Sequence, residues 1–229
     1  MTPRSAGMAA APAPVADQAA PILFSDRGCP FAHRVLALLD HLGAPVERRE
    51  TAVGAKPAGL EQYSAAKRIP LLVHGDLVLT ESRVIAEHLA EYHSFADAYP
   101  DDVATRSRHR HAMALLDLTI VPVLFGRKQI AIDDLQLDDA LRALAAATES
   151  TTPRPCLLSL HAAPIWLRLR WWQPTGTVAR AVQVRPTLQA WLDATIELAC
   201  VNRTAPDREA HTDDLVRARQ AGLVGPSTS

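Results

Sequence analysis

One cysteine stands where a helix is expected to begin. Cys29 follows a short apolar run at 21–24 and the turn Asp26-Arg27-Gly28, and it precedes Pro30. Proline is favoured at the first helical position because the N–H that it lacks would have no partner there. Unpaired N–H groups and the helix dipole favour an anion at this end and lower the pKa of a cysteine held there. We therefore expect Cys29 to be a reactive thiol with a lowered pKa; the alternative is a small buried side chain without chemistry.

The neighbours of Cys29 limit its chemistry. Ala32 occupies the place where a dithiol redox protein has its second cysteine, so an external thiol must release any mixed disulfide formed at Cys29. His33 lies four residues after Cys29, near the same helix face, and is either a proton partner of the thiol or a solvated surface histidine. These two side chains are too few to bind a metal ion, so no metal is expected.

The segment around Cys29 has the pattern of a small α/β unit. Apolar residues at helical spacing follow the cysteine, and Gly43 ends that helix. A strand, a helix and a second strand imply a right-handed parallel crossover, and the charges of the second strand favour a position near the sheet edge. The expected order is β-α-β-α-β-β-α, with strands at 21–25 and 45–53, a short helical segment at 56–67, a hairpin at 68–79 and a helix from 80–82 to 92.

Pro70 stands directly before an apolar strand, which is unusual because proline cannot donate to the hydrogen-bond ladder. One solution is a cis peptide between Ile69 and Pro70 in a tight bend. The other is a trans proline that merely starts the strand. Thr80 or Ser82 is expected to cap the helix that follows, with Glu81 adding negative charge at its positive end.

After residue 93 the sequence becomes helical throughout. Helical apolar patterns cover 103–128, 134–147, 157–172 and 185–198, and Pro122 is expected to kink the first of them. A βα-rich front and an all-helical back indicate two domains, of class α/β and all-α. The expected division is a disordered extension at 1–20, an α/β domain at 21–93, a linker at 94–102, a helical domain at 103–203 and a tail at 204–229.

The overall composition excludes several classes of protein. A formal net charge of −1 over 229 residues gives no support for binding to nucleic acid or to an anionic membrane. No apolar run approaches the roughly 18 residues that span a bilayer. Prolines break the apolar part of 1–20, which argues against a signal peptide. Three scattered cysteines fit neither a disulfide framework nor a zinc site, so a reducing, cytoplasmic location is expected.

Three motifs taken together resemble the cytosolic glutathione transferase superfamily. Cys29-Pro30-Phe31-Ala32, Ile69-Pro70 and Glu81-Ser82 occur in the order and approximate spacing of a thioredoxin-like, glutathione-binding domain. Cys-Pro-Phe-Ala with a following Arg34 resembles the omega class and its bacterial relatives, which use a cysteine. The resemblance implies a thioredoxin-like domain followed by a helical bundle, glutathione as cosubstrate, and a homodimer.

The resemblance also implies roles for residues near the thiol. Cys29 matches the cysteine that forms a mixed disulfide with glutathione, and Phe31 matches the aromatic residue beside it. Val53 matches an apolar contact, and Lys56 matches a lysine that binds the glycyl carboxylate. On its own, Lys56 would be read as a solvated surface lysine.

The other implied roles concern the remainder of glutathione. Ile69, before the cis Pro70, matches the residue whose backbone pairs with the cysteinyl part, and Glu81 and Ser82 match the pair that holds the γ-glutamyl end. The chemistry agrees, because Glu81 can take an ammonium while Ser82 and helix N–H groups can take a carboxylate. On their own, Glu81 and Ser82 would equally suit an ordinary helix cap.

These roles predict a monothiol transferase that acts on a small disulfide or electrophilic substrate. Deglutathionylation or dehydroascorbate-type reduction is the first expected activity, and conjugation to electrophiles is the second. The alternative is a non-enzymatic binding protein of the stringent-starvation type on the same scaffold. A membrane-inserting relative is disfavoured by the lack of a long apolar stretch.

One departure from the family pattern concerns residues 155–164. Family members carry a Ser/Thr-x-x-Asp capping box at the start of the buried helix before an Ala-Pro pair, and here Pro155 to Ser159 leads almost directly into that pair. One or two turns, with the capping Asp, are therefore expected to be absent or replaced, and a lost cap costs about 1 kcal/mol. This would alter the pocket for the second substrate.

Overall fold

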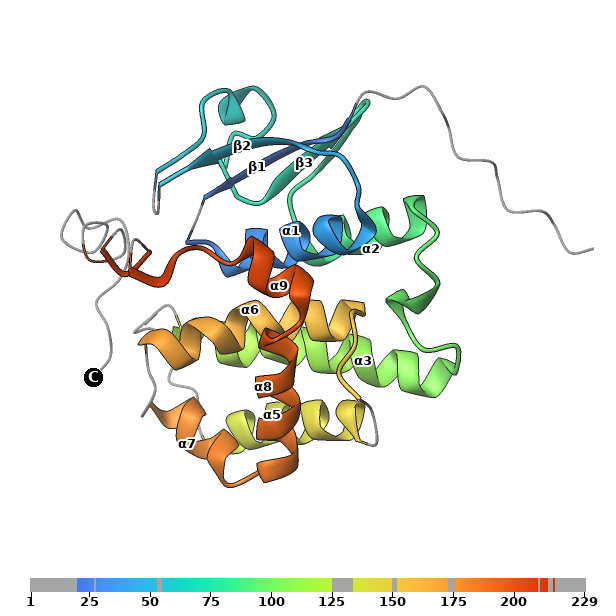
Figure 1. Cartoon of the computed structure of the whole chain (residues 1–229), viewed down its shortest axis with the longest axis vertical. Helices are drawn as coiled ribbons and strands as arrows, with labels where there is room; N and C mark the ends of the chain where they lie inside the picture. Colours follow the sequence, from blue (N-terminus) through green and yellow to red (C-terminus); the bar gives the residue numbers. More distant parts are fainter. Residues whose placement is uncertain are drawn as a thin grey trace, which may run out of the picture.

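The computed structural model describes residues 20–26, 28–52, 55–124, 134–149, 152–172, 176–209, 211–213 and 216. Figure 1 shows a small sheet, with two helices beneath it, at one end of the molecule and a larger group of helices at the other. This is a thioredoxin-like sheet followed by a helical region, as predicted. Within the described ranges, no helix has the length and apolar character needed to span a bilayer.

The sheet has four strands in the order β2-β1-β3-β4. β1 pairs in parallel with β2 and antiparallel with β3, so that Leu23 lies opposite both Arg48 and Leu72. The charged strand β2 is at the edge, as predicted, whereas β3 is buried along its whole length. The strands are β1 (Ile22–Asp26), β2 (Glu47–Thr51), β3 (Leu71–His74) and β4 (Leu77–Leu79).

Helix α1 (Pro30–Leu42) connects β1 to β2 and begins as the sequence predicts, with Pro30 at its first turn. Gly43 ends it in the left-handed conformation at φ 60°, which glycine adopts without steric cost. The N–H of Gly43 donates to the carbonyl of Asp40, and the next N–H donates to that of Leu39. The buried face of α1 packs between the sheet and α6 (Leu157–Trp172).

The Ile69–Pro70 peptide is cis, so the first of the two alternatives is confirmed. The predicted cap of the next helix, α2 (Ser82–Tyr92), is wrong in detail. Glu81 is the N-cap residue, and it makes no side-chain capping bond. The Ser82 hydroxyl lies within the first turn and accepts a hydrogen bond from Arg34, because burial against α1 brings the two side chains together.

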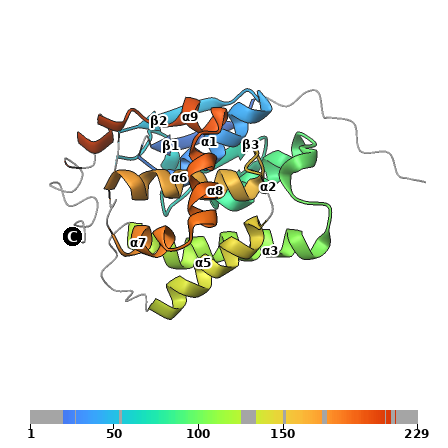
Figure 2. The same ribbon diagram turned by 60° about the horizontal axis from the view of Figure 1, so that its bottom comes forward.

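The helices of the second half pack around α6. Figures 1 and 2 show α6 running beneath α1, with α3 and α8 against its other sides, and these contacts agree with the packing of the side chains. A π-helical turn, η3, interrupts the long helix just before Pro122, where a kink was predicted. The other elements are η1 (Leu60–Gln62), η2 (Ala96–Ala98), α3 (Val103–Leu115), η3 (Leu116–Ile120), α4 (Val121–Leu124), α5 (Asp134–Thr148), α7 (Thr177–Gln183), α8 (Pro186–Ile196) and α9 (Ala199–Thr204).

At the start of α6, the expected capping Asp is replaced rather than absent. The carbonyl of Cys156 accepts the first helical hydrogen bond, from the N–H of Leu160, and the N–H of Cys156 donates to Ser159 Oγ at 3.0 Å. Ser159 Oγ also donates to the carbonyl of Arg154 at 2.6 Å. A serine therefore takes the place of the expected Asp at the third helical position, as in a capping box, and α6 keeps 16 residues.

One large apolar core joins the sheet to the helical region. It extends from Leu23 of β1 through Val35 and Leu38 of α1 to Leu160 of α6 and Leu192 of α8. A smaller cluster, around Phe24 and Leu60, covers the opposite face of the sheet. Because α1 and α6 share a core, the start of α1 is fixed against the helical region.

Candidate functional site

Most of the predicted site residues line one cavity of about 710 Å³. Its walls come from the start of α1, the loop before β3, the start of α2 and one face of α3 and η3. The predicted residues among its lining are Phe31, Lys56, Ile69, Pro70, Glu81 and Ser82. Residues that lie far apart in the sequence therefore share one open volume.

Two predicted residues are not named among the lining of the cavity. Val53 lies outside the described residues. Cys29 is not among the described residues that line the cavity; it is the half-buried N-cap residue of α1, two positions before Phe31, which does line it. The thiol therefore lies beside the cavity rather than in its wall.

The predicted lowering of the Cys29 pKa is wrong. Burial raises the pKa of the Cys29 thiol to about 11, and the nearby carboxylate of Asp26 adds to this increase. The backbone N–H groups of Ala32 and Phe31 and the charge of Arg168 act in the opposite direction. The predicted helix-end effect is thus present, but the cost of desolvating a thiolate is larger.

An ion pair between Arg34 and Asp117 lies at the cavity, which Asp117 lines. Arg34 of α1, only 2% exposed, donates to Asp117 of η3 through both terminal nitrogens, at 3.2 and 3.3 Å, and to Ser82 Oγ at 3.2 Å. His161 of α6 donates through Nε2 to the same Asp117 oxygen at 3.1 Å. Burial opposes ionisation of Asp117, yet Arg34 and His161 together hold the pKa of its carboxyl well below its usual range.

This network orients the Ser82 hydroxyl. An arginine can only donate hydrogen bonds, so Ser82 Oγ accepts from Arg34. The hydroxyl proton of Ser82 remains available to an acceptor in the cavity, such as a carboxylate. Sequence reasoning named Arg34 only as part of a motif and missed Asp117, because an ion pair between distant helices leaves no local pattern.

The rim of the cavity is rich in charge. Arg68 pairs with Glu81 at 3.2 Å, and both side chains are about two-thirds exposed. Lys56 and Arg83 also line the cavity, so its three basic side chains exceed the acidic pair of Glu81 and Asp117. Such a surface favours an anionic ligand that carries one ammonium. Arg68 was also missed, although its place directly before the Ile69-Pro70 motif was a usable signal.

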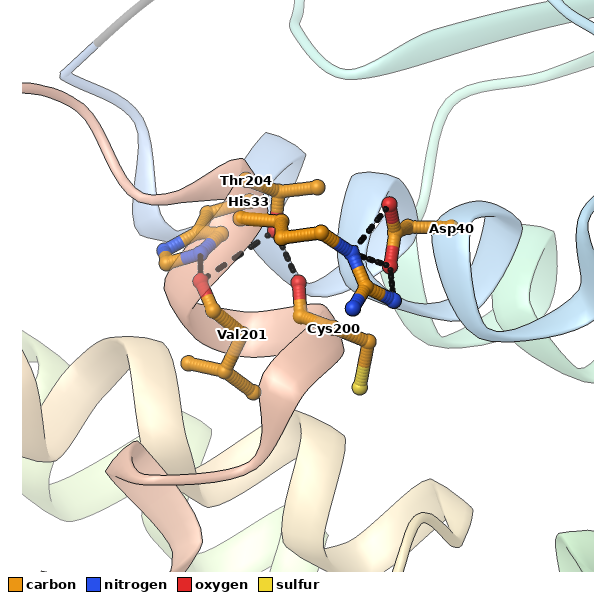
Figure 3. Close-up of polar contacts among 6 residues, drawn as sticks. His33, Asp40, Cys200, Val201 and Thr204 are labelled. Carbon is orange, nitrogen blue, oxygen red and sulfur yellow. Dashed lines mark hydrogen bonds and ion pairs between the residues drawn. The ribbon is translucent and has the colours of Figure 1, made fainter.

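His33 is neither the proton partner nor the solvated histidine considered above. It is 2% exposed, and Nε2 lies 3.0 Å from the carbonyl oxygen of Val201 in α9 (Figure 3). Arg168 Nη1 donates to Nδ1 at 2.6 Å, so Nε2 carries the hydrogen and donates to Val201. Burial and Arg168 hold the pKa of His33 well below its usual range, so the ring is neutral.

Comparison with protein families agrees with this site. The model of the family "Glutathione S-transferase, N-terminal domain" matches residues 20–91, which include the sheet and the cavity motifs. Glutathione S-transferase U2 of Arabidopsis thaliana is 25% identical over 199 residues, which are 80% of this chain and 87% of that protein. Glutathione S-transferase U6 of the same plant is 35% identical over 98 residues, covering 42% of this chain and 44% of that protein.

Solved structures share the fold over most of the chain. Glutathione transferase Omega 1C from Trametes versicolor superposes with a TM-score of 0.73 at 18% identity, covering 89% of this chain and 98% of that chain. A glutathione S-transferase from Methylobacterium radiotolerans, solved in complex with glutathione sulfonate, gives 0.64 at 18% identity, covering 82% and 95%. Residues 20–91 thus match the N-terminal domain of glutathione S-transferases, and most of the chain shares the fold of the glutathione transferases.

Proposed function

We propose that the protein is a glutathione-dependent thiol transferase in which Cys29 forms a mixed disulfide with glutathione. The observation that carries the proposal is the cavity that joins Phe31, Lys56, the Ile69–Pro70 bend, Glu81 and Ser82 beside the thiol. A structural neighbour solved with glutathione sulfonate supports glutathione as the cosubstrate.

The charges of glutathione fit the polar groups of the cavity. The Ser82 hydroxyl and the free N–H groups at the start of α2 suit the γ-glutamyl carboxylate, and Glu81 suits the adjacent ammonium. Lys56 suits the glycyl carboxylate as a point charge. Because Arg68 pairs with Glu81, we expect it to turn toward a ligand carboxylate when the ammonium takes its place.

The proposed reaction has two exchange steps. The Cys29 thiolate attacks the glutathione sulfur of a glutathionylated substrate and forms a disulfide with it. The disulfide between glutathione and the substrate breaks, and the substrate leaves as a thiolate that takes a proton from water. A second glutathione thiolate then attacks the glutathione sulfur of the Cys29 disulfide, which restores Cys29 and releases oxidised glutathione. Ala32 supplies no thiol for an internal second step, and Cys156 and Cys200 are buried.

Conjugation is a second candidate activity, which the raised pKa of Cys29 favours. A thiol that remains protonated at neutral pH can donate a hydrogen bond to the thiolate of bound glutathione and so prepare it for attack on an electrophile. The same raised pKa implies that thiol transfer accelerates as the pH rises.

The two activities separate in one pair of assays. One assay follows reduction of the mixed disulfide of glutathione and 2-mercaptoethanol, and the other follows glutathione conjugation to a chlorodinitrobenzene. We expect Cys29→Ser to lose the first activity and to keep or gain the second, since a serine hydroxyl can also donate to a glutathione thiolate. Cys200→Ser, which changes a buried thiol, is the control and is expected to keep both.

Full disulfide reduction by Cys29→Ser would overturn the proposal. Absence of both activities, together with no binding of glutathione, would favour the non-enzymatic binding protein of the stringent-starvation type. The proposal includes a cytoplasmic location, because turnover requires a pool of reduced glutathione.

A further inference from the structure

A buried arginine with unused donors lies near the start of α1. Arg168 of α6 is 0% exposed, and its Nη1 donates to His33 Nδ1 at 2.6 Å. Its guanidinium also lies 5.6 Å from the centre of the Trp171 ring. Its Nε and Nη2 are buried, and neither has a hydrogen-bond partner among the described residues. Buried polar groups are nearly always paired, so two unused donors on a buried cation call for an explanation.

The contact with His33 places Arg168 against the first turn of α1. His33 lies one turn after Cys29, and its backbone N–H donates to the carbonyl of Cys29 at 3.0 Å. Residues four apart share one face of a helix, so the arginine that holds the His33 ring faces the end where the thiol lies. The neutral His33 ring, donating through Nε2 to Val201, in turn fixes the orientation of the guanidinium.

Other titratable groups among the described residues also lie near Cys29 or act on His33. Asp26, at the end of β1, bears a carboxylate that opposes a thiolate. Arg34, on α1, is paired with Asp117 of η3. His211, in the segment after α9, stacks on Trp172 and contributes to the lowered pKa of His33. Among the described residues, Arg168 is thus the cation near the thiol that has no carboxylate within ion-pair distance.

We propose that Arg168 is a positioning residue for Cys29. The buried charge of Arg168 stabilises the Cys29 thiolate, and His33 holds the guanidinium in place. The S–H bond of Cys29 breaks, the proton passes to water, and the negative charge forms on Sγ close to the guanidinium. The inference rests on the proposed function only in taking Cys29 as the reacting thiol. An opposite charge a few ångströms away commonly lowers a pKa by about 1 to 3 units, and burial limits its screening.

The first test compares alkylation of Cys29 by iodoacetamide, followed by peptide mass, between about pH 6.5 and 9.5. Below the pKa the rate follows the thiolate fraction, so we expect Arg168→Met to react about tenfold more slowly than the parent at every pH. Arg168→Lys keeps the charge and is expected to recover most of the rate. The matched control is Arg170→Met, two residues along α6, where the side chain is half exposed and pairs with Asp193.

A folded Arg168→Met variant with the parent's rate at each pH would overturn the proposal. If Arg168 had a purely structural role, Arg168→Met would not lower the alkylation rate by the same factor at every pH, and Arg168→Lys would not restore that rate. The measurement is also independent of glutathione. If oxidised glutathione forms an adduct but Arg168→Met alkylates at the parent's rate, the proposed function stands and this inference fails. If the variant alkylates more slowly but no glutathione adduct forms, this inference stands and the proposed function fails.

A second test uses the unaltered protein, so it decides the matter even if Arg168→Met does not fold. Iodoacetate carries a negative charge that iodoacetamide lacks, and a fixed cation beside Cys29 attracts it. We expect the ratio of the iodoacetate rate to the iodoacetamide rate at Cys29 to exceed that of N-acetylcysteine by about tenfold. An equal or smaller ratio would contradict a cation at the thiol.

Discussion

Burial decides the protonation state of the titratable side chains around the site. It raises the pKa of Cys29 to about 11, and burial together with Arg34 lowers the pKa of His161 to about 4. Burial and the charge of Arg168 lower the pKa of His33. In each case the charged form would lose its hydration, and the interactions available in the folded protein do not compensate for that loss. At neutral pH these three groups are therefore uncharged, while Arg34 and Arg168 carry the positive charge around the thiol.

The neutral histidines predict a loss of stability in acid. His161 binds a proton at about pH 4 when folded but at about 6.5 when unfolded, so between these values the unfolded chain holds more protons. Stability is then fully present above about pH 6.5 and declines as the pH falls toward 4, and the lowered pKa of Asp117 extends the loss below that.

Urea unfolding at several pH values tests this prediction. His161→Gln should reduce the slope of unfolding free energy against pH in this window, by at most about 1.4 kcal/mol per pH unit. His111→Gln, at an exposed position of α3, is the control. An unchanged slope in the first variant would show that His161 is not a buried neutral base.

The Arg34–Asp117 pair makes a second prediction at this scale. Asp117→Asn leaves the buried Arg34 charge without its carboxylate, so we expect a loss of roughly 2 to 3 kcal/mol in the free energy of unfolding, discounted because Asp117 is about one-third exposed. Asp97→Asn breaks an exposed pair with Arg154 and should cost less than about 1 kcal/mol. Equal losses in the two variants would contradict a special role for the buried pair.

At the scale of the helices and strands, several local sequence signals predicted the structure. Gly43 ends α1, the charged β2 lies at the sheet edge and the Ile69–Pro70 peptide is cis, each as the residues predicted. At the start of α6, the residues left open whether the usual capping Asp was absent or replaced. The structure gives its role to Ser159, a fully buried serine whose hydroxyl accepts from the N–H of Cys156.

This cap gives a prediction at the scale of the element. Ser159→Ala removes the acceptor of the Cys156 N–H and the donor to the Arg154 carbonyl, and should lower the free energy of unfolding by about 1 to 2 kcal/mol. Cys156→Ser places a favoured cap residue at the same helix start and should be as stable as the parent or more so. Urea denaturation of both variants tests the capping box, and a Ser159→Ala protein of parental stability would contradict it.

Across the whole molecule, long-range contacts hold both ends of α1. His33 reaches Val201, 168 residues away, and Asp40 pairs with Arg203 of α9 at 2.6 Å (Figure 3). Sequence reasoning identified the cavity motifs because each is local to a turn or a helix start. It could not identify Arg168 or Asp117, since their partners become neighbours only when the sheet layer and the helical region pack together.

The expected homodimer is the prediction at the scale of the assembly. Two large apolar side chains, Leu77 and Val78, follow one another in β4 and are each more than one-third exposed. Exposed apolar side chains at a sheet edge are candidates for an interaction surface. Light scattering on the purified protein should give twice the mass of one chain, and a single-chain mass at micromolar concentration would contradict the expectation.

The central claim is that Cys29 forms a mixed disulfide with glutathione. The most direct measurement is intact mass after incubation with oxidised glutathione, at about pH 7 and about pH 9, for the parent, Cys29→Ser and Cys200→Ser. We expect one glutathione adduct on Cys29 in the parent and in Cys200→Ser, faster at the higher pH, and none in Cys29→Ser. No adduct in the parent, or an adduct that persists in Cys29→Ser, would contradict the claim.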